Sequence, residues 1–235
     1  RMFAKDVFIM EHNHMIYLVI SCTPTKFASC IRHIGRVKYN HAAISLDKDL
    51  SKLYSFARPY HCGIFMGGLV TESYESYTLN KSKNVPIVMF AIPVTDEQYN
   101  TVRLIISDIK NDHEYMYNLF SVLSYPLTKG FGTYKAFSCV EFVVYLLNML
   151  GYCLDKPRWS YKPDDFLNVF SENIVYTGDI RKYIAKSHNP MYFRPINKVV
   201  VFDNTRGLYK ILVRSLSHRN YPKAFKKLFL NIWHI

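Results

Sequence analysis

A nearly uninterrupted apolar run with the sequence MIYLVIS occupies residues 15–21. A short continuous run of this kind is typical of a strand that is buried in the core. A Thr-Pro-Thr segment interrupts the run, and the apolar residues that follow recur at helical spacing up to Gly35. These features predict a buried strand followed by a helix over residues 25–35.

Later segments show both strand and helix patterns. Two capping boxes, T-x-x-Q and S-x-x-E, predict helices that start after Thr95 and after Ser138. A proline followed by two aspartates at 163–165 predicts the start of a short helix. We therefore predict an α+β fold with antiparallel strands after the first helix and a long helix late in the chain. A further helix is expected over residues 114–123, and strands are expected over residues 40–46, 52–57, 69–79, 85–94, 173–176 and 198–202.

Composition limits the class of protein. The 235 residues are 49% hydrophobic and 20% charged, which excludes a disordered chain and a collagen-like repeat and suits one domain, or one domain with an appendage. No apolar run approaches the roughly 18–20 residues that a bilayer-spanning helix needs. The five cysteines are an odd number without a C-x-x-C pair, so we expect mostly free thiols in a reducing compartment.

Positive charge is concentrated at the end of the sequence. The formal net charge is +12, and residues 204–235 contribute seven Lys or Arg and no acid. We therefore divide the chain into a domain of residues 1–190 and a basic C-terminal extension of residues 191–235, consisting of a strand and an amphipathic helix. The helix is expected from the apolar spacing of Ala224, Phe225, Leu228, Phe229 and Ile232.

That extension has two interpretations. It is either a helix that docks on the domain with a solvated basic face, or a segment that contacts an anionic membrane surface or a nucleic acid. Outside residues 204–235 the charge is ordinary and no nucleic-acid motif is present, so a nucleic-acid partner is not favoured. A membrane-surface contact through residues 204–235 remains open.

Cys139 is the strongest candidate for a reactive residue. If Ser138 is the N-cap, Cys139 is the first residue of the helix, where unpaired N–H groups and the positive end of the dipole favour a thiolate. The same N–H groups could bind the oxyanion of a tetrahedral intermediate. The alternative is that Cys139 is a small apolar residue in a first helical turn.

A catalytic thiol needs a base, and His41 is the best placed of the nine histidines. It opens an apolar strand, so its ring would be held rigidly. The alternative is a surface or capping histidine. His12 and His14 form an H-x-H pair without acids or cysteines at ligand spacing, so we expect no metal site and no cofactor.

These features together resemble the circularly permuted papain-like hydrolases, which are relatives of the NlpC-type murein endopeptidases. Within that superfamily the sequence looks most similar to YiiX-like bacterial proteins. The order of a histidine strand followed later by a cysteine helix is the more specific part of the resemblance, which covers roughly residues 15–185. The strings that carry it are T-P-T-x-F at 23–27, Y-N-H at 39–41, L-Y-S-F at 53–56, G-G-L-V with Glu72 at 67–72, and F-S-C-V-E-F-V at 137–143.

The resemblance implies a permuted papain-like fold, with an antiparallel sheet packed against the helix that carries the nucleophile. It implies a cysteine hydrolase acting on amide or ester bonds, with Cys139 as nucleophile and His41 as base. YiiX-like relatives have a glutamate on the next strand to orient the imidazole, and here Ser55 occupies the matching place. Serine brings no charge to stabilise imidazolium. Glu72 is the substitute candidate, and its alternative is a solvated carboxylate.

Two functions follow as expectations. The first is a thiol-dependent hydrolase or acyl transferase with a peptide or lipid-like acyl substrate. The second is a papain-like binding module that has lost efficient catalysis, which the serine at the acid position favours. No export signal or wall-binding repeat is visible, so we expect a cytoplasmic protein, peripheral to the membrane if residues 204–235 bind it.

Overall fold

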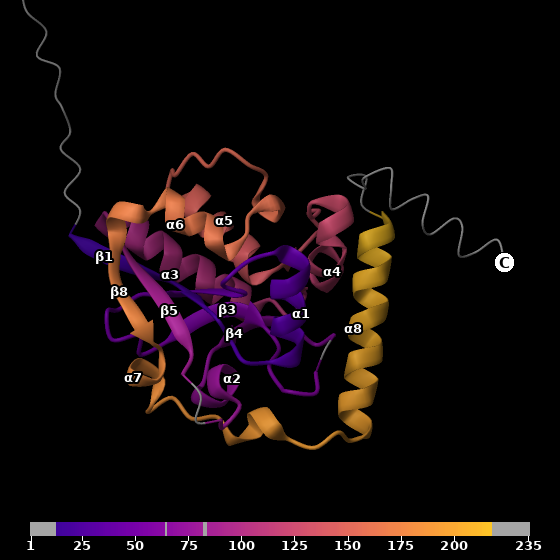
Figure 1. The fold of residues 1–235 in the computed structure, drawn as a ribbon. Helices are drawn as coiled ribbons and strands as arrows, with labels where there is room; N and C mark the ends of the chain where they lie inside the picture. The colour runs from indigo at the N-terminus through magenta and orange to yellow at the C-terminus, as the bar shows by residue number, and fades with distance from the viewer. Residues whose placement is uncertain (1–12, 64, 82–83, 218–235) are drawn as a thin grey trace, which may run out of the picture.

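The computed structural model describes residues 13–63, 65–81 and 84–217. A six-stranded sheet with the order β4-β3-β2-β1-β5-β8 forms its centre, and each neighbouring pair in it is antiparallel (Figure 1). The predicted α+β fold is thus confirmed. The strands of this sheet are β1 His14–Ser21, β2 His41–Ser45, β3 Leu53–Ala57, β4 Gly68–Thr71, β5 Pro86–Val94 and β8 Ile174–Asp179, while β6 Met116–Tyr117 and β7 Ala136–Phe137 form a separate parallel pair.

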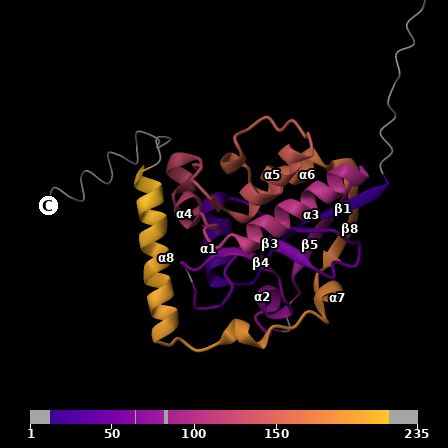
Figure 2. The same cartoon turned by 180° about the vertical axis from the view of Figure 1, so that it is seen from behind.

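Helices cover both faces of the sheet (Figures 1 and 2). Helices α3 and α5 pack on one face, and α2 and α7 lie on the other. Successive side chains of a strand point to opposite faces, so Leu18 of β1 enters one core cluster and Val19 enters the other. The helices are α1 Lys26–Gly35, α2 Tyr74–Thr78, α3 Asp96–Asn111, α4 Leu119–Thr128, α5 Cys139–Met149, α6 Phe166–Val169, α7 Arg181–Ile184 and α8 Lys198–Ser217, with short 3-10 turns η1 Arg158–Ser160, η2 Pro163–Asp165, η3 Ser171–Asn173 and η4 Pro190–Phe193.

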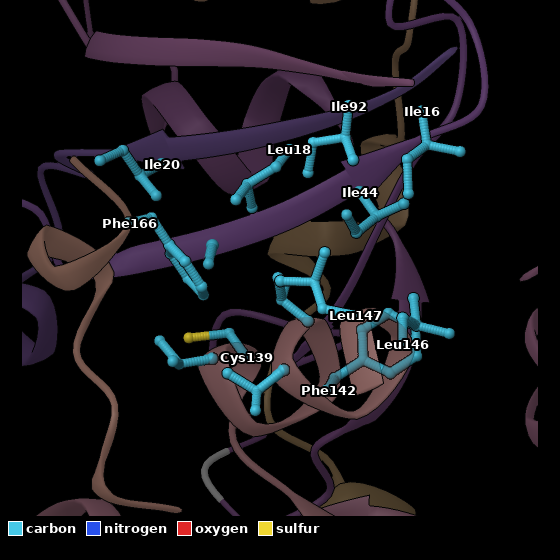
Figure 3. Close-up of a cluster of buried hydrophobic side chains, with 14 of the residues drawn as sticks. Ile16, Leu18, Ile20, Ile44, Ile92, Cys139, Phe142, Leu146, Leu147 and Phe166 are labelled. Carbon is cyan, nitrogen blue, oxygen red and sulfur yellow. The ribbon is translucent and has the colours of Figure 1, made fainter. Parts of the chain in front are cut away.

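Helix α5 begins where the sequence predicts. The Ser138 hydroxyl accepts a hydrogen bond from the Glu141 N–H, and the Glu141 carboxylate accepts one from the Ser138 N–H, which completes the capping box. Phe142, Leu146 and Leu147 then face Leu18 and Ile44 of the sheet (Figure 3). The apolar stripe thereby fixes the rotation of α5 about its axis, and with it the direction of Cys139.

Two expected elements are corrected because pairing or capping ends them early. The strand expected over 69–79 stops at Thr71, since Ser73 and Ser76 form a capping box that starts α2. In the segment 114–123, the first part pairs as β6 with β7, and α4 begins only at Leu119. Tertiary pairing outweighs local helix propensity there.

The strand expected over residues 198–202 is also wrong, because these residues open helix α8. Three consecutive valines favour a strand locally. Val200 and Ile211 lie about three helical turns apart and are both buried, so the helical conformation lets one face of the segment pack on the domain. The amphipathic helix expected from Ala224 onward lies outside the described residues.

The core beneath α5 gives a stability prediction. Phe142 is fully buried among aromatic and aliphatic side chains, so Phe142→Ala should lower the free energy of unfolding by about 3–5 kcal/mol. Leu104, exposed on α3, is the control, and Leu104→Ala should change the free energy by less than about 0.5 kcal/mol. Urea denaturation of both variants measures the difference, and equal losses would contradict the assigned core.

Candidate active site

His41 is held at the start of β2 by a loop that distant residues fix in place. The Asp164 carboxylate, in η2, accepts hydrogen bonds from the backbone N–H groups of Lys38 and Tyr39, at 2.7 and 2.9 Å. An aspartate more than a hundred residues away thus ties down the approach to β2. This restraint limits the freedom of the His41 ring.

Asn40 joins the same strand to the turn after β1. Its side-chain oxygen accepts hydrogen bonds from the Thr23 N–H at 3.0 Å and from Arg32 Nη1 at 2.7 Å, and its amide nitrogen donates to the Thr23 hydroxyl at 2.7 Å. Thr25 caps α1 by accepting from the Ala28 N–H. The T-P-T-x-F and Y-N-H strings are therefore adjacent in space and are joined by buried hydrogen bonds.

Glu72 is the acid that contacts the histidine. It follows β4 directly, and its Oε1 lies 2.7 Å from His41 Nε2. Ser55, on the intervening strand β3, donates a hydrogen bond to the same carboxylate oxygen, and Ser76 of α2 donates to Oε2 at 2.6 Å. Ser55 therefore supports Glu72, and the carboxylate at position 72 provides the charge beside the imidazole.

Cys139 lies close to the same imidazole. Helix α5 packs across β2 and β3, and Cys139, its first residue, is a free thiol within hydrogen-bonding reach of His41. Because Glu72 occupies Nε2, Nδ1 is the nitrogen left for the sulfur. The structure thus brings the four candidate residues Cys139, His41, Glu72 and Ser55 into one chain of contacts.

Neighbouring charges govern the protonation of His41 and Glu72. Burial lowers the pKa of His41, but the negative charge of Cys139, the hydrogen bond to Cys139 and the contact with Glu72 outweigh it and raise the pKa to about 10. Burial also acts to raise the pKa of Glu72, yet His41, Ser55 and Ser76 together hold that pKa below its usual value. Because folding raises the His41 pKa from 6.5, protonated His41 contributes to the free energy of unfolding. This contribution is complete below pH 6.5 and is lost as the pH rises through about 10.

Two adjoining hollows lie at the site, one lined by His41 and the other by Cys139. The first lies on the His41 side and carries polar groups that include Thr23, Arg58 and Tyr192. The second lies on the Cys139 side and is mainly apolar, and the two share Ile31, Asn40 and Tyr117 at their border. The apolar hollow is lined by Ile31, Val37, Val122, Tyr125, Val140, Trp159, Tyr161 and Pro163, among others.

Tyr117 is a site residue that the sequence did not indicate. It borders both hollows, and burial together with the charge of Cys139 raises its pKa well above its usual range, so the phenol is neutral. Its N–H donates to the Gly67 carbonyl at 2.7 Å, and a Cβ at position 67 would lie 2.4 Å from the Tyr117 Cβ. Gly67 therefore permits the close approach of Tyr117, but neither residue has a local signal of this role.

Other candidate groups do not join the site. Among the described residues no cluster of three or more His, Cys, Asp or Glu could hold a metal ion. His14 stacks on Tyr99 and pairs with Asp96 at the far end of β1, and His12 lies outside the described residues. In the part of the chain that the structure covers, no helix has the length and apolar character to cross a membrane.

Comparison with known proteins gives no relative. No family model, no curated protein and no solved structure matches this chain.

The contact between Glu72 and His41 can be tested by titration. Glu72→Gln removes the negative charge beside the imidazole, so the His41 pKa should fall by about one to three pKa units. Glu75→Gln is the matched control, because Glu75, on the adjacent helix α2, pairs with His188 rather than with His41. NMR titration of the histidine rings measures both, and a His41 pKa unaltered by Glu72→Gln would contradict the contact.

Proposed function

We propose that this chain is a thiol-dependent hydrolase or acyl transferase that cleaves an amide or ester bond through an acyl-enzyme on Cys139. The observation that carries the proposal is the placement of one imidazole between a carboxylate and a thiol at the start of a helix. A nucleophile, a base and a group that orients the base are the arrangement that covalent acyl transfer requires.

Acylation follows from these positions. The Cys139 thiolate attacks the carbonyl carbon, a C–S bond forms, and the carbonyl electron pair moves onto oxygen. The N–H groups of Cys139 and Val140 can stabilise that oxyanion, because the capping box uses the N–H groups of Ser138 and Glu141 and leaves these two in the first turn of α5. Protonated His41 then gives its proton to the leaving nitrogen or oxygen, the C–N or C–O bond breaks, and a thioester remains on Cys139.

Deacylation reverses the role of the histidine. Neutral His41 accepts a proton from water as the water oxygen attacks the thioester carbon. The C–S bond breaks, the electron pair returns to sulfur, and the carboxylic acid is released beside a thiolate and an imidazolium. In a transferase an alcohol or amine attacks in place of water, and His41 accepts its proton in the same way.

The order of elements supports a permuted papain-like fold as the framework for this chemistry. The histidine strand β2 precedes the nucleophile helix α5 in the chain, and the antiparallel sheet packs against that helix. The resemblance of residues 15–185 to circularly permuted papain-like hydrolases agrees with this order. The carboxylate after β4 supplies the charge that Ser55 lacks.

The two hollows suggest how a substrate would lie. The acyl group becomes attached to Cys139, so its chain would occupy the mainly apolar hollow on that side. The leaving group receives its proton from His41 and would lie in the more polar hollow. An apolar acyl chain linked to a polar leaving group, as in a lipid-like ester or amide, fits both halves better than a polar peptide does.

A second candidate is a papain-like binding module without efficient turnover. Cys139 is only 5% exposed, so a substrate must reach the sulfur through the apolar hollow. This low exposure favours the binding module. The two candidates differ in one measurable property, the formation of an acyl-enzyme.

Acyl-enzyme formation can be measured with p-nitrophenyl butyrate. We expect a burst of nitrophenol and a covalent mass increase on Cys139 in the unmodified chain. Cys139→Ala should abolish both, and His41→Ala should slow the burst by about 10²–10⁴-fold because general acid–base catalysis is lost. Cys153→Ala, which removes an exposed thiol, is the control and should react normally. A burst that persists in Cys139→Ala would refute the assignment, and no burst in the unmodified chain would favour the binding module.

The proposed position of the acyl chain in the apolar hollow gives a separate prediction. Val122→Phe narrows the apolar hollow beside Cys139, so the rate with p-nitrophenyl laurate should fall by about tenfold or more relative to the butyrate ester. Leu123→Phe enlarges an exposed neighbour on the same helix and should leave the ratio of the two rates unchanged. An unchanged ratio in Val122→Phe would place the acyl chain elsewhere.

A further inference from the structure

Helix α8 has an apolar face that the domain does not cover. It lies along one side of the molecule, outside the two helical layers that sandwich the sheet (Figures 1 and 2). Phe202 and Tyr209, at 67% and 68% exposure, lie on the side opposite the buried Val200 and Ile211. The outward stripe consists of Val199, Phe202, Tyr209 and Val213, which recur at spacings of three, seven and four residues.

The inward side shows that this orientation of α8 is fixed by packing. Ile211 packs with Met116 and Ala136 of the β6–β7 pair. Asn204 accepts a hydrogen bond from the Phe65 N–H at 3.0 Å, and a Cβ at Gly207 would lie 2.1 Å from the Phe65 carbonyl oxygen. A rotation of α8 that hid the outward stripe would break these contacts, so the exposed apolar residues belong to the docked helix.

Positive charge accompanies the stripe. Helix α8 carries Lys198, Arg206, Lys210 and Arg214 against the single acid Asp203, a net charge of +3. Arg206 is exposed and lies within the apolar stripe, between Phe202 and Tyr209 along the helix. The sequence that follows, from residue 218 to 235, keeps this combination of apolar and basic residues and has no acid.

We propose that the outward face of α8, formed by Val199, Phe202, Tyr209 and Val213, docks on a membrane surface rich in anionic phospholipids. Apolar side chains enter the boundary between headgroups and acyl chains, while Lys and Arg extend to the lipid phosphates. Each basic side chain near such a surface adds to the attraction.

Charge favours a membrane over a second copy of this chain. Two α8 faces packed together would bring +3 against +3, with Arg206 in the contact, and like charges disfavour such pairing. An anionic leaflet supplies the opposite charge together with an apolar layer. A nucleic acid supplies the charge but offers little to bury Phe202 and Tyr209.

Sedimentation of the full chain with lipid vesicles tests the proposal. We expect binding to mixed phosphatidylcholine–phosphatidylglycerol vesicles, loss of most binding on phosphatidylcholine alone, and weakening at high salt. Phe202→Ser combined with Tyr209→Ser should lower the partition coefficient by about tenfold or more. Leu104→Ser combined with Met149→Ser removes two exposed apolar residues elsewhere and should bind normally.

Two further variants distinguish loss of membrane binding from misfolding of the serine variant and from failure of the catalytic proposal. Arg206→Gln combined with Lys210→Gln should lower binding several-fold without touching an apolar side chain, which tests the surface even if the serine variant folds poorly by circular dichroism. Cys139→Ala should bind as the unmodified chain does, so failure of the catalytic proposal leaves this one intact. The proposal would be overturned by equal binding to both vesicle types or by unaltered binding of the α8 variants. It would also be overturned if light scattering showed a dimer that the serine substitutions dissociate.

Discussion

The buried carboxylate of Glu72 is the interaction on which the arrangement of the site depends. An ionised carboxylate in the interior is strongly unfavourable unless donors surround it. Here an imidazole and two serine hydroxyls occupy its oxygens. These donors come from β2, β3 and α2, while Glu72 itself follows β4, so the carboxylate can be satisfied only when all four elements are in place. Compensation of this charge therefore couples the local geometry of the site to the pairing of three strands.

The thiol of Cys139, the proposed nucleophile, is positioned by a different mechanism, which is core packing. Cys139 is placed by the capping box of α5 and by the apolar stripe beneath it, with Phe142 and Leu146 as fully buried members. Close-packed side chains resist rotation of the helix, since any rotation would leave cavities. His41 is thus fixed by hydrogen bonds and the Cys139 thiol by dispersion and burial, and the candidate site lies where these two sets of interactions meet.

The sequence predicted what depends on neighbouring residues. Both capping boxes, the buried strand β1 and the pairing region of β2 and β3 follow from local patterns, and the structure has them where expected. The strand expected at 198–202 failed because burial of Val200 and Ile211 against the domain decides its conformation. Local propensity carries no information about that contact.

The same limit applies within the site. Cys139 and His41 were candidates because a helix start and a strand start can be read from the sequence. The choice between Ser55 and Glu72 required knowing which side chain points at the imidazole across two strands. Asp164 and Tyr117 act through contacts with residues far away in the chain, at Tyr39 and Gly67, so no spacing in the sequence could have indicated them.

The causes of the raised pKa of His41 suggest how one residue could serve as acid and then as base. The charge of Cys139 is the largest influence that raises this pKa to about 10, against the opposing effect of burial. In the proposed reaction, acylation converts the thiolate to a neutral thioester, so that influence disappears while burial remains. The pKa of His41 would then fall, and the imidazole, having given its proton to the leaving group, would stay neutral and ready to accept a proton from water. Beside the protonated imidazole, the hydrogen bonds from His41, Ser55 and Ser76 and the charge of His41 hold the pKa of Glu72 below its usual value, so its carboxylate can orient the ring.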